Sequence, residues 1–381
     1  MRKIIKFIYK KIIKPVLFLI PADYVHVFFL KSGRFFGKYY LTKKITNLIF
    51  AYKDKSLEQN VLGIDFKNPI GLAAGFDYDA DLPGILNDVG FGFQTVGTVT
   101  NLYYQGNAFP MLGRLPKSKS LLVNKGFKSN GIDYALKKIN KRKKDFPVGI
   151  SLGTTNKKYE KEEDMINDFY SSVLKAEKEN YFDYFEINIS CPNLINLPEN
   201  FVKFDTKEGL KNLLDKLSEI KLSRPAFIKM YCEKTVEETL ALCEVAENYN
   251  FISGFIFSNL VKDRNNKYLN RGEIEKLKNY KGNFSGKPTE ELANNLISAV
   301  YKKYKDTNRF IIIGCGGVFE AKDAYEKIKR GATLIQMITG MIYEGPSQIG
   351  LINKDLVKLI EKDGYKNISE AIGIYSKKVD F

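Results

Sequence analysis

The chain has 381 residues, of which 44% are hydrophobic and 27% charged, and a formal net charge of +16. This length and composition can bury a large core, so the sequence predicts a globular protein and excludes a disordered one. The four cysteines form no CxxC pair and the only histidine is His26, so we expect no disulfide framework, no metal site and no histidine-based catalytic centre.

The positive charge is concentrated at the start of the chain. Residues 1–50 contain eleven Lys and Arg residues against one acid, Asp23, and therefore carry +10 of the net charge. On a helical wheel over residues 2–20, an apolar sector lies opposite a lysine sector, formed by Ile5, Ile8, Ile12, Val16 and Leu19 and by Lys3, Lys6, Lys10 and Lys14. A basic amphipathic helix of this kind is typical of a segment that lies in a membrane interface, and it is too short and too charged to span the bilayer. The alternatives are an organelle-targeting peptide and a helix packed on its own domain.

A second short helix with an apolar face is expected after Pro21, over residues 22–36. The two helices would form a hairpin whose apolar faces suit a lipophilic ligand as well as a membrane. We therefore predict a helical extension over residues 1–50 that contacts a membrane through residues 1–30. The second unit is expected over residues 51–381.

From about residue 60 the sequence alternates short apolar runs with amphipathic segments. The strand candidates are residues 70–75, 93–99, 148–153, 184–190, 226–230, 254–258, 310–315 and 333–338. Helices are expected over residues 162–180, 206–220, 235–248, 289–305 and 321–330. Eight buried parallel strands that alternate with helices indicate an α/β fold of the (β/α)8 TIM barrel type. A doubly wound sheet is the alternative, but it offers no good place for eight strands with a phosphate site near the last two.

A barrel of this type carries its chemistry at the carboxyl ends of its strands. Glycines at 314, 316 and 317, followed by a helix, predict a phosphate site at the helix N-terminus, which Thr339 and Gly340 would complete. Lys229 ends a strand inside the barrel mouth and needs an anionic partner, because a buried unpaired ammonium is unfavourable. Cys191 follows another strand, among amides and a hydroxyl, and we expect it to be a catalytic base. The competing interpretation is a small buried hydrophobic side chain.

Six motifs follow one another along this part of the chain. They are IGLAAGFD (70–77), GFGFQTVGTVT (90–100), NISCPN (188–193), FSGKP (284–288), IIGCGGV (312–318) and TGMIYEGP (339–346). Their combination resembles the dihydroorotate dehydrogenases, which are FMN enzymes on a (β/α)8 barrel. The segment PADYVHV (21–27) is similar to the N-terminal helix pair of the class 2 enzymes of this family. Those enzymes associate with a membrane and use a quinone, which reaches the flavin through an apolar tunnel between the two helices.

The resemblance implies oxidation of (S)-dihydroorotate to orotate in pyrimidine biosynthesis, with FMN as cofactor and a quinone as electron acceptor. Residues that match the FMN-binding positions are Ala74, Gly75, Thr98, Ser151, Asn188, Lys229, Ser258, Gly286, Gly316, Gly317, Thr339 and Gly340. Those that match the substrate positions are Tyr78, Asn124, Phe127, Asn188, Asn193 and Asn259, and His26 and Arg114 match quinone positions. The implied location is the cytoplasmic face of the cell membrane, or the mitochondrial inner membrane in a eukaryote.

The chain departs from the class 2 pattern around the base. Class 2 enzymes usually have serine where this chain has Cys191, and class 1 enzymes have cysteine. Leu194 stands in place of a threonine that assists the serine. A thiol with a pKa of about 8.5 needs less help to act as a base than a serine hydroxyl. We therefore expect a class 2 body with a class 1 base.

The substrate wall departs further. Tyr78 stands where the family has a lysine that faces the substrate, and Leu260 replaces a hydroxyl residue. An expected asparagine falls on Val123, with Asn124 one place on. These differences keep open an FMN oxidoreductase of the same fold that acts on another reduced ring, including a tRNA dihydrouridine synthase. A barrel that has lost catalysis is a third alternative, against which the flavin motifs argue. We expect no nucleic acid partner, because the basic charge lies on an apolar N-terminal helix.

Overall fold

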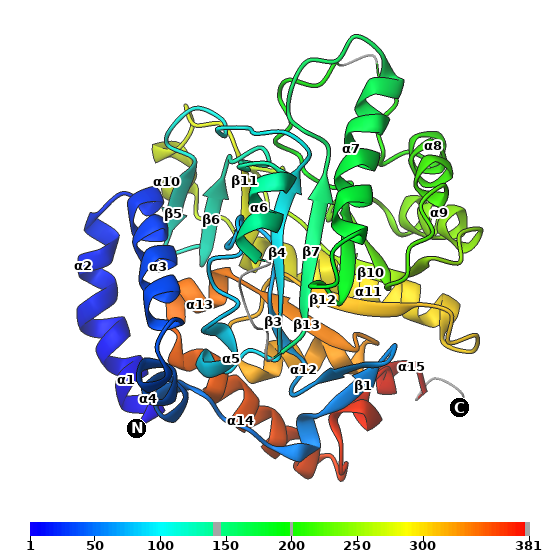
Figure 1. The fold of residues 1–381 in the computed structure, drawn as a ribbon. Coiled ribbons are helices and arrows are strands. Elements are labelled where there is room, and N and C mark those ends of the chain that lie inside the picture. The colour runs from blue at the N-terminus through cyan, green and yellow to red at the C-terminus, as the bar shows by residue number, and fades with distance from the viewer. Residues whose placement is uncertain (140–145, 199–200, 378–381) are drawn as a thin grey trace.

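A computed structural model of the chain describes residues 1–139, 146–198 and 201–377. Its centre is a closed barrel of parallel strands in the order β10-β12-β13-β3-β4-β7-β8-β9 (Figure 1). All the predicted apolar runs form barrel strands, so the barrel prediction is confirmed and the doubly wound sheet is excluded. In chain order the strands are β3 (Ile70–Leu72), β4 (Phe93–Thr100), β7 (Val148–Gly153), β8 (Tyr184–Asn188), β9 (Ala226–Lys229), β10 (Ile252–Phe257), β12 (Ile311–Cys315) and β13 (Leu334–Met337).

Amphipathic helices cover the outside of the barrel. In α8 (Lys207–Ser218), the leucines that face the barrel recur every three or four residues and are fully buried, and the Thr206 hydroxyl accepts a hydrogen bond from the Gly209 N–H at the helix start. The five predicted helices between strands are confirmed within a few residues. The covering helices are α5 (Leu86–Val89), α6 (Ile132–Ile139), α7 (Glu162–Glu177), α8, α9 (Val236–Glu247), α10 (Arg271–Lys276), α11 (Glu290–Tyr304), α12 (Ala321–Lys329), α13 (Thr339–Glu344), α14 (Ser347–Lys362) and α15 (Ile374–Lys377).

The barrel interior is built in two layers of side chains. The lower layer is apolar and aromatic, with Phe93, Tyr184, Phe227, Ile256, Ile313 and Leu334. Every second residue of a strand points to the same face, so the positions two residues further on form the next layer up. That layer is mostly polar and contains Thr95, Glu186, Lys229, Cys315 and Gln336. The layer therefore brings charge and hydrogen-bonding groups to the carboxyl ends of the strands.

Two small sheets, which the sequence did not predict, close the barrel at its ends. The hairpin β1 (Gln59–Val61) and β2 (Ile64–Phe66) adds Val61 and Phe66 to the lower apolar layer. Strands β5 (Leu112–Leu115), β6 (Ser120–Val123) and β11 (Asn283–Gly286) form an antiparallel sheet in the order β11-β6-β5. The second sheet joins the loops that follow β4 and β10, and so it holds the FSGKP motif beside β6 and the turn before it.

The first 50 residues form helices on one side of the barrel (Figure 1). α1 (Arg2–Ile8) continues through a π-helical turn, Tyr9–Ile13, into α2 (Lys14–Leu19), and α3 (Ala22–Phe36) follows as predicted. A further helix, α4 (Tyr40–Phe50), was not predicted. Among the described residues, no single helix is long and apolar enough to cross a membrane. Only the bent pair 2–19 and 22–36, which meet at 120°, passes that test when both are counted together.

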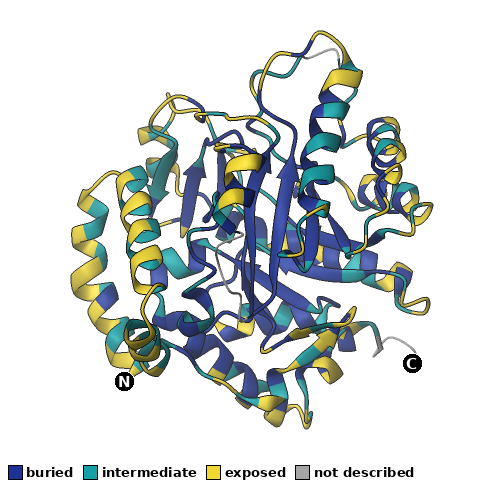
Figure 2. Cartoon of the chain, in the orientation of Figure 1, coloured by how far each residue is buried: buried dark blue, intermediate teal, exposed yellow. Residues whose placement is uncertain are grey.

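The first helix docks on the barrel through its charged side. The ammonium groups of Lys6 and Lys10 lie 2.9 and 2.8 Å from Oε2 of Glu344 on α13. The opposite, apolar side faces outward, where Leu19 is 86% exposed, as the outer helices of Figure 2 show. Packing on the barrel, the alternative to a membrane helix, is therefore correct for the lysine side only. Of the apolar stripe, Ile8, Ile12, Val16 and Leu19 are exposed, and Ile5 is half-buried.

Candidate active site

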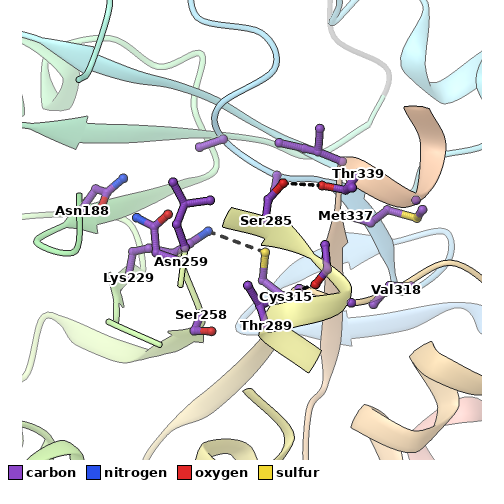
Figure 3. A pocket seen from close by; sticks show the side chains of 18 of the residues that line it. Asn188, Lys229, Ser258, Asn259, Ser285, Thr289, Cys315, Val318, Met337 and Thr339 are labelled. Atoms are coloured by element: carbon purple, nitrogen blue, oxygen red, sulfur yellow. Dashed lines mark hydrogen bonds between the residues drawn. The ribbon is translucent and has the colours of Figure 1, made fainter. Parts of the chain in front are cut away.

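A cavity opens at the carboxyl ends of the barrel strands (Figure 3). It contains about 600 Å³ of atom-free space, including the part that is open to solvent. Many of the residues that were predicted to bind cofactor or substrate line it together, although they come from distant parts of the sequence. They are Ala74, Asn188, Lys229, Ser258, Asn259, Gly286, Gly316, Gly317, Thr339 and Gly340.

A chain of hydrogen bonds runs beneath the cavity through the polar layer. The Asn188 amide donates to the Thr98 hydroxyl at 2.8 Å, and the Thr98 and Ser151 hydroxyls are 2.9 Å apart. Ser151 donates to Oε1 of Glu186 at 2.7 Å. The Ser151 hydroxyl has one hydrogen and donates it to Glu186. In the bond between the two hydroxyls Thr98 is therefore the donor, and it accepts from the Asn188 amide. Thr98 and Ser151 thus belong to the site although they do not line the cavity.

Lys229 finds its anionic partner within the chain, in Glu186. Strands β8 and β9 pair Asn188 with Lys229, and Glu186 stands two residues earlier on β8, so both side chains enter the barrel. The Lys229 ammonium lies 3.7 Å from Oε2 of Glu186 and donates to Oε1 of Gln336 at 3.2 Å. Burial acts to lower the pKa of Lys229, but Cys315 and Glu186 beside it outweigh burial and raise it. Sequence reasoning missed Glu186, although an acid inside an apolar strand, two residues before Asn188, was a usable signal.

The cavity fits a phosphate-bearing cofactor such as FMN. Among the described residues, the Ser258 hydroxyl and Oε2 of Glu186 are buried without a hydrogen-bond partner, and both residues line the cavity. Such orphaned groups are satisfied when a polar ligand is present. Gly316 has a φ of +100°, and a Cβ there would lie 2.2 Å from the Thr289 hydroxyl. A ligand can therefore approach the backbone at this rim more closely than at any residue with a side chain.

The predicted phosphate site at a helix N-terminus is wrong in one respect. The N-terminus of α12 is closed by its own capping box, in which Oδ2 of Asp323 accepts from the N–H groups of Phe319 and Glu320, both at 2.9 Å. The carboxylates of Glu320 and Asp323 would repel a phosphate there. The remaining donors at the rim are the backbone of Gly316 and Gly317 and the start of α13 at Thr339 and Gly340. The Thr339 hydroxyl lies 2.8 Å from that of Ser285.

Cys191 lies in the loop that follows β8, half-buried and outside the residues that line the cavity. The loop is held in place because the Asn259 amide donates to both the carbonyl and the hydroxyl of Ser190 at 3.0 Å. Burial raises the pKa of the Cys191 thiol to about 12, while the Asn193 N–H and the charge of Lys262 act to lower it. The expectation of a thiol with an ordinary pKa is therefore wrong, because the expectation ignored desolvation of the thiolate.

A cluster of buried amides forms the wall beside Cys191. The Asn107 amide donates to Oδ1 of Asn124 at 2.9 Å, Asn193 donates to the Val123 carbonyl at 3.0 Å, and Asn283 donates to Oδ1 of Asn193 at 2.5 Å. The asparagine expected at this wall is thus Asn124, and Val123 contributes only its backbone. Asn107 and Asn283 were not predicted, because both lie outside the motifs.

Phe127 is a buried residue with a φ of +63°, and its ring lies against Gly153, where a Cβ would be 2.5 Å from it. The predicted Gly75 donates its N–H to the Gly97 carbonyl at 2.7 Å, which fixes the loop after β3 to β4. Phe127 therefore contributes to the site by packing, and Gly75 contributes through its backbone hydrogen bond. Tyr78, three residues after Gly75, is buried.

His26 and Arg114 both lie at the contact between the helical extension and the barrel. Nε2 of His26 donates to the Phe76 carbonyl at 2.7 Å, and burial with the nearby charge of Lys125 lowers its pKa to about 3. Arg114 donates to the Ile20 carbonyl at 2.7 Å, and its guanidinium carbon lies 4.6 Å from the centre of the Phe18 ring. Both side chains therefore tie α2 and α3 to the barrel.

Comparisons with known proteins agree with this architecture. The family model for dihydroorotate dehydrogenase matches residues 56–360. A protein named dihydroorotate dehydrogenase (quinone) from Christiangramia forsetii is 35% identical over 355 residues, covering 93% of this chain and 99% of that protein. The protein of the same name from Nostoc punctiforme is 31% identical over 384 residues, covering 97% and 99%.

The solved structure of the Eimeria tenella enzyme DHODH in complex with ferulenol matches with a TM-score of 0.73 at 24% identity, covering 88% of this chain and 94% of that chain. This likeness shows that the two chains share a fold. The sequence matches extend through nearly the whole chain and carry the family that the motifs predicted. The chain belongs to the dihydroorotate dehydrogenase family.

Proposed function

We propose that this chain oxidises dihydroorotate to orotate, with FMN as its cofactor and a quinone as the electron acceptor. The relatives that match most of the chain carry the name of this quinone-linked activity. The observation that carries the proposal is the arrangement at the strand ends. A cavity with a buried cation in its wall, Lys229, stands next to a loop that presents a thiol, Cys191.

FMN, when bound, would take a hydride from the substrate ring and pass the electrons on to the quinone. Lys229 is the cation available to stabilise negative charge on the reduced cofactor, and Glu186 and Gln336 hold it in position. Gly286 has a φ of +82°, and a Cβ there would lie 2.4 Å from the Lys119 carbonyl, so only glycine fits between this segment and the turn before β6. The residues that would hold FMN are Ala74, Gly75, Thr98, Ser151, Asn188, Lys229, Ser258, Gly286, Gly316, Gly317, Thr339 and Gly340.

Cys191 would remove the proton from C5 of the dihydroorotate ring through its thiolate sulfur and later release that proton to solvent. Amide side chains suit the ring edge because each can donate two hydrogen bonds and accept two. Asn188, Asn193 and Asn259 therefore keep capacity for substrate beyond their bonds within the protein. Excluding water from this wall would favour proton transfer to the thiolate over leakage to solvent.

The quinone would approach between the helical extension and the barrel, past His26 and Arg114. The extension would rest on a membrane through residues 1–30, because its apolar stripe is exposed and its positive charge suits anionic lipids. The enzyme would then be peripheral, at the cytoplasmic face of the cell membrane or at the mitochondrial inner membrane in a eukaryote. A quinone dissolved in the bilayer would reach the site directly from this position.

Anaerobic flavin reduction tests the role of Cys191. Cys191→Ala should keep FMN bound but fail to reduce it with dihydroorotate, and Cys191→Ser should reduce it slowly. An unchanged rate in Cys191→Ala would refute the assignment of the base.

The second candidate function is oxidation of another reduced ring, which the departures at Tyr78 and Leu260 favour. A panel of reduced pyrimidines separates the two functions. Flavin reduction by dihydrouracil but not by dihydroorotate would support the second candidate.

A further inference from the structure

Lys125 is a buried cation to which the reaction above assigns no role. It follows β6 in the loop that borders the substrate wall and is 7% exposed. Its ammonium lies 3.3 Å from Nδ1 of His26 and 4.8 Å from the centre of the Tyr78 ring. Among the described residues, no carboxylate lies within 4 Å of this ammonium. A buried ammonium with three donors and no carboxylate within ion-pair distance is unfavourable unless a ligand compensates it.

The contact with His26 does not neutralise this charge. Nε2 of His26 donates to the Phe76 carbonyl at 2.7 Å, so Nδ1 carries the lone pair and accepts from Lys125. The low pKa of His26, about 3, keeps the ring neutral at physiological pH. Lys125 is therefore in contact with one neutral acceptor and one aromatic face, and Asp23 on α3 acts on its charge without forming an ion pair.

Tyr78 connects Lys125 to the reacting groups. Position 78 is where the resemblance implies a lysine that faces the substrate, and the tyrosine ring lies under the Lys125 ammonium. Burial raises the pKa of the Tyr78 phenol, and the charges of Asp23 and Cys191 act in the same direction. On the other side, Lys125 follows Asn124, whose amide belongs to the substrate wall. Tyr78 provides no cation at this position, but Lys125 places an ammonium beside it from a different segment of the chain.

We propose that Lys125 binds the carboxylate of dihydroorotate, in the role of the lysine that Tyr78 replaces. This inference rests on the proposed function. A carboxylate compensates the buried charge and accepts a charge-assisted hydrogen bond, which is stronger than a bond between neutral groups. A quinone carbonyl offers a neutral acceptor and would leave the charge uncompensated. The substrate carboxylate is therefore the occupant that the charge of Lys125 favours.

The charge of Lys125 depends on groups from three segments. Asp23 and His26 face it from α3, Tyr78 from the loop after β3, and Lys128 from its own loop. Burial lowers the pKa of Lys125 to about 8, with Asp23 opposing burial and Lys128 adding to it. The ammonium is present below that pKa and is lost as the pH rises through it. Orotate binding should therefore weaken above about pH 8.

Binding of orotate to the FMN-loaded full chain, followed by the change in flavin absorbance, tests the proposal. Uracil serves as the probe that has the same ring without the carboxylate. Lys125→Met should raise the Kd for orotate by about 10- to 100-fold, the range expected for a charge-assisted bond, and leave the Kd for uracil unchanged. Adding Tyr78→Lys to Lys125→Met should recover most of the affinity. The matched control Lys128→Met, at an exposed lysine of the same loop, should change the Kd by less than about twofold.

Three results would overturn the proposal: an unchanged Kd for orotate in Lys125→Met, an equal loss of orotate and uracil, or a change confined to the KM for quinone. If Lys125→Met does not retain FMN, the pH dependence of the unaltered protein decides. A Kd for orotate that is flat between pH 7 and 9 would overturn the proposal, and a rise above pH 8 would support it. Failure of the proposed function has a different signature, since the unaltered protein would then bind no orotate at any pH.

Discussion

The raised pKa of the half-buried Cys191 thiol predicts how flavin reduction depends on pH. With a pKa of about 12, only about one thiol in 10⁵ is a thiolate at pH 7, and each pH unit raises this fraction tenfold. If Cys191 is the base, the rate of flavin reduction by dihydroorotate should rise about tenfold per pH unit from pH 7 to 10. Anaerobic stopped-flow mixing at saturating substrate measures this rate directly. A plateau with a midpoint near pH 8.5 would refute the reasoning, because the thiol would then have an ordinary pKa.

Substitution of Lys262 provides a second test of the role of the Cys191 thiolate. The charge of Lys262 acts to lower the pKa of Cys191, and its side chain is exposed, so the interaction is screened to about 0.2–1 kcal/mol. Lys262→Met should therefore slow flavin reduction by about 1.4- to 5-fold at every pH below the thiol pKa and leave the slope unchanged. The ammonium groups of Lys262 and Lys234 lie 5.5 and 6.0 Å from the centre of the Tyr231 ring, and Lys234 pairs with Asp205 at 3.4 Å. The matched control is therefore Lys234→Met. Equal effects of the two variants would contradict a specific action of Lys262.

Three further predictions concern stability and membrane contact. Glu186→Gln leaves Lys229 buried without an anion, so urea unfolding should show a loss of about 3–5 kcal/mol, and a loss below about 0.5 kcal/mol would contradict the pairing. The pKa of His26 is about 3 in the folded protein and about 6.5 in the unfolded chain. The free energy of unfolding should therefore fall by up to about 1.4 kcal/mol per pH unit below pH 6.5. In His26→Gln this His26-dependent loss of stability should be absent. Leu19→Glu should weaken liposome binding by about 10- to 100-fold. Lys11→Gln changes the net charge by the same amount and should weaken binding far less. Similar losses in the two variants would contradict binding through the apolar stripe.

The barrel could be predicted because its strands are buried on both faces. Runs such as Phe93–Thr100 and Ile252–Phe257 contain no charged residue and are buried along almost their whole length, which distinguishes them from the amphipathic helices between them. The hairpin at 59–66 and the sheet of β5, β6 and β11 were missed because their strands are short and half-polar. Helix α4 was missed because it has no sequence signal at its start: Tyr39 stands at the N-cap position and makes no capping hydrogen bond.

Residues of the site could be predicted only where they stand within one continuous sequence motif. Cys191 and the glycines of the cavity rim stand in continuous motifs, whereas the Glu186–Lys229 pair depends on the register between β8 and β9. The contact of Lys125 with His26 and Tyr78 joins segments about 50 and 100 residues apart, and no local pattern indicates it. The phosphate prediction failed at α12 because the Asp323 carboxylate caps the N-terminus of its own helix. This side chain occupies the N–H groups that a phosphate would need, and the glycine motif alone does not indicate it.

The central claim, that this chain passes electrons from dihydroorotate through FMN to a quinone, is tested most directly by one anaerobic experiment. Purified, FMN-loaded protein is mixed with dihydroorotate, and a short-chain quinone is added afterwards. Flavin absorbance should bleach within the first mixing and return after the second, with one orotate formed per flavin reduced. Flavin that stays oxidised in the presence of millimolar dihydroorotate would contradict the account.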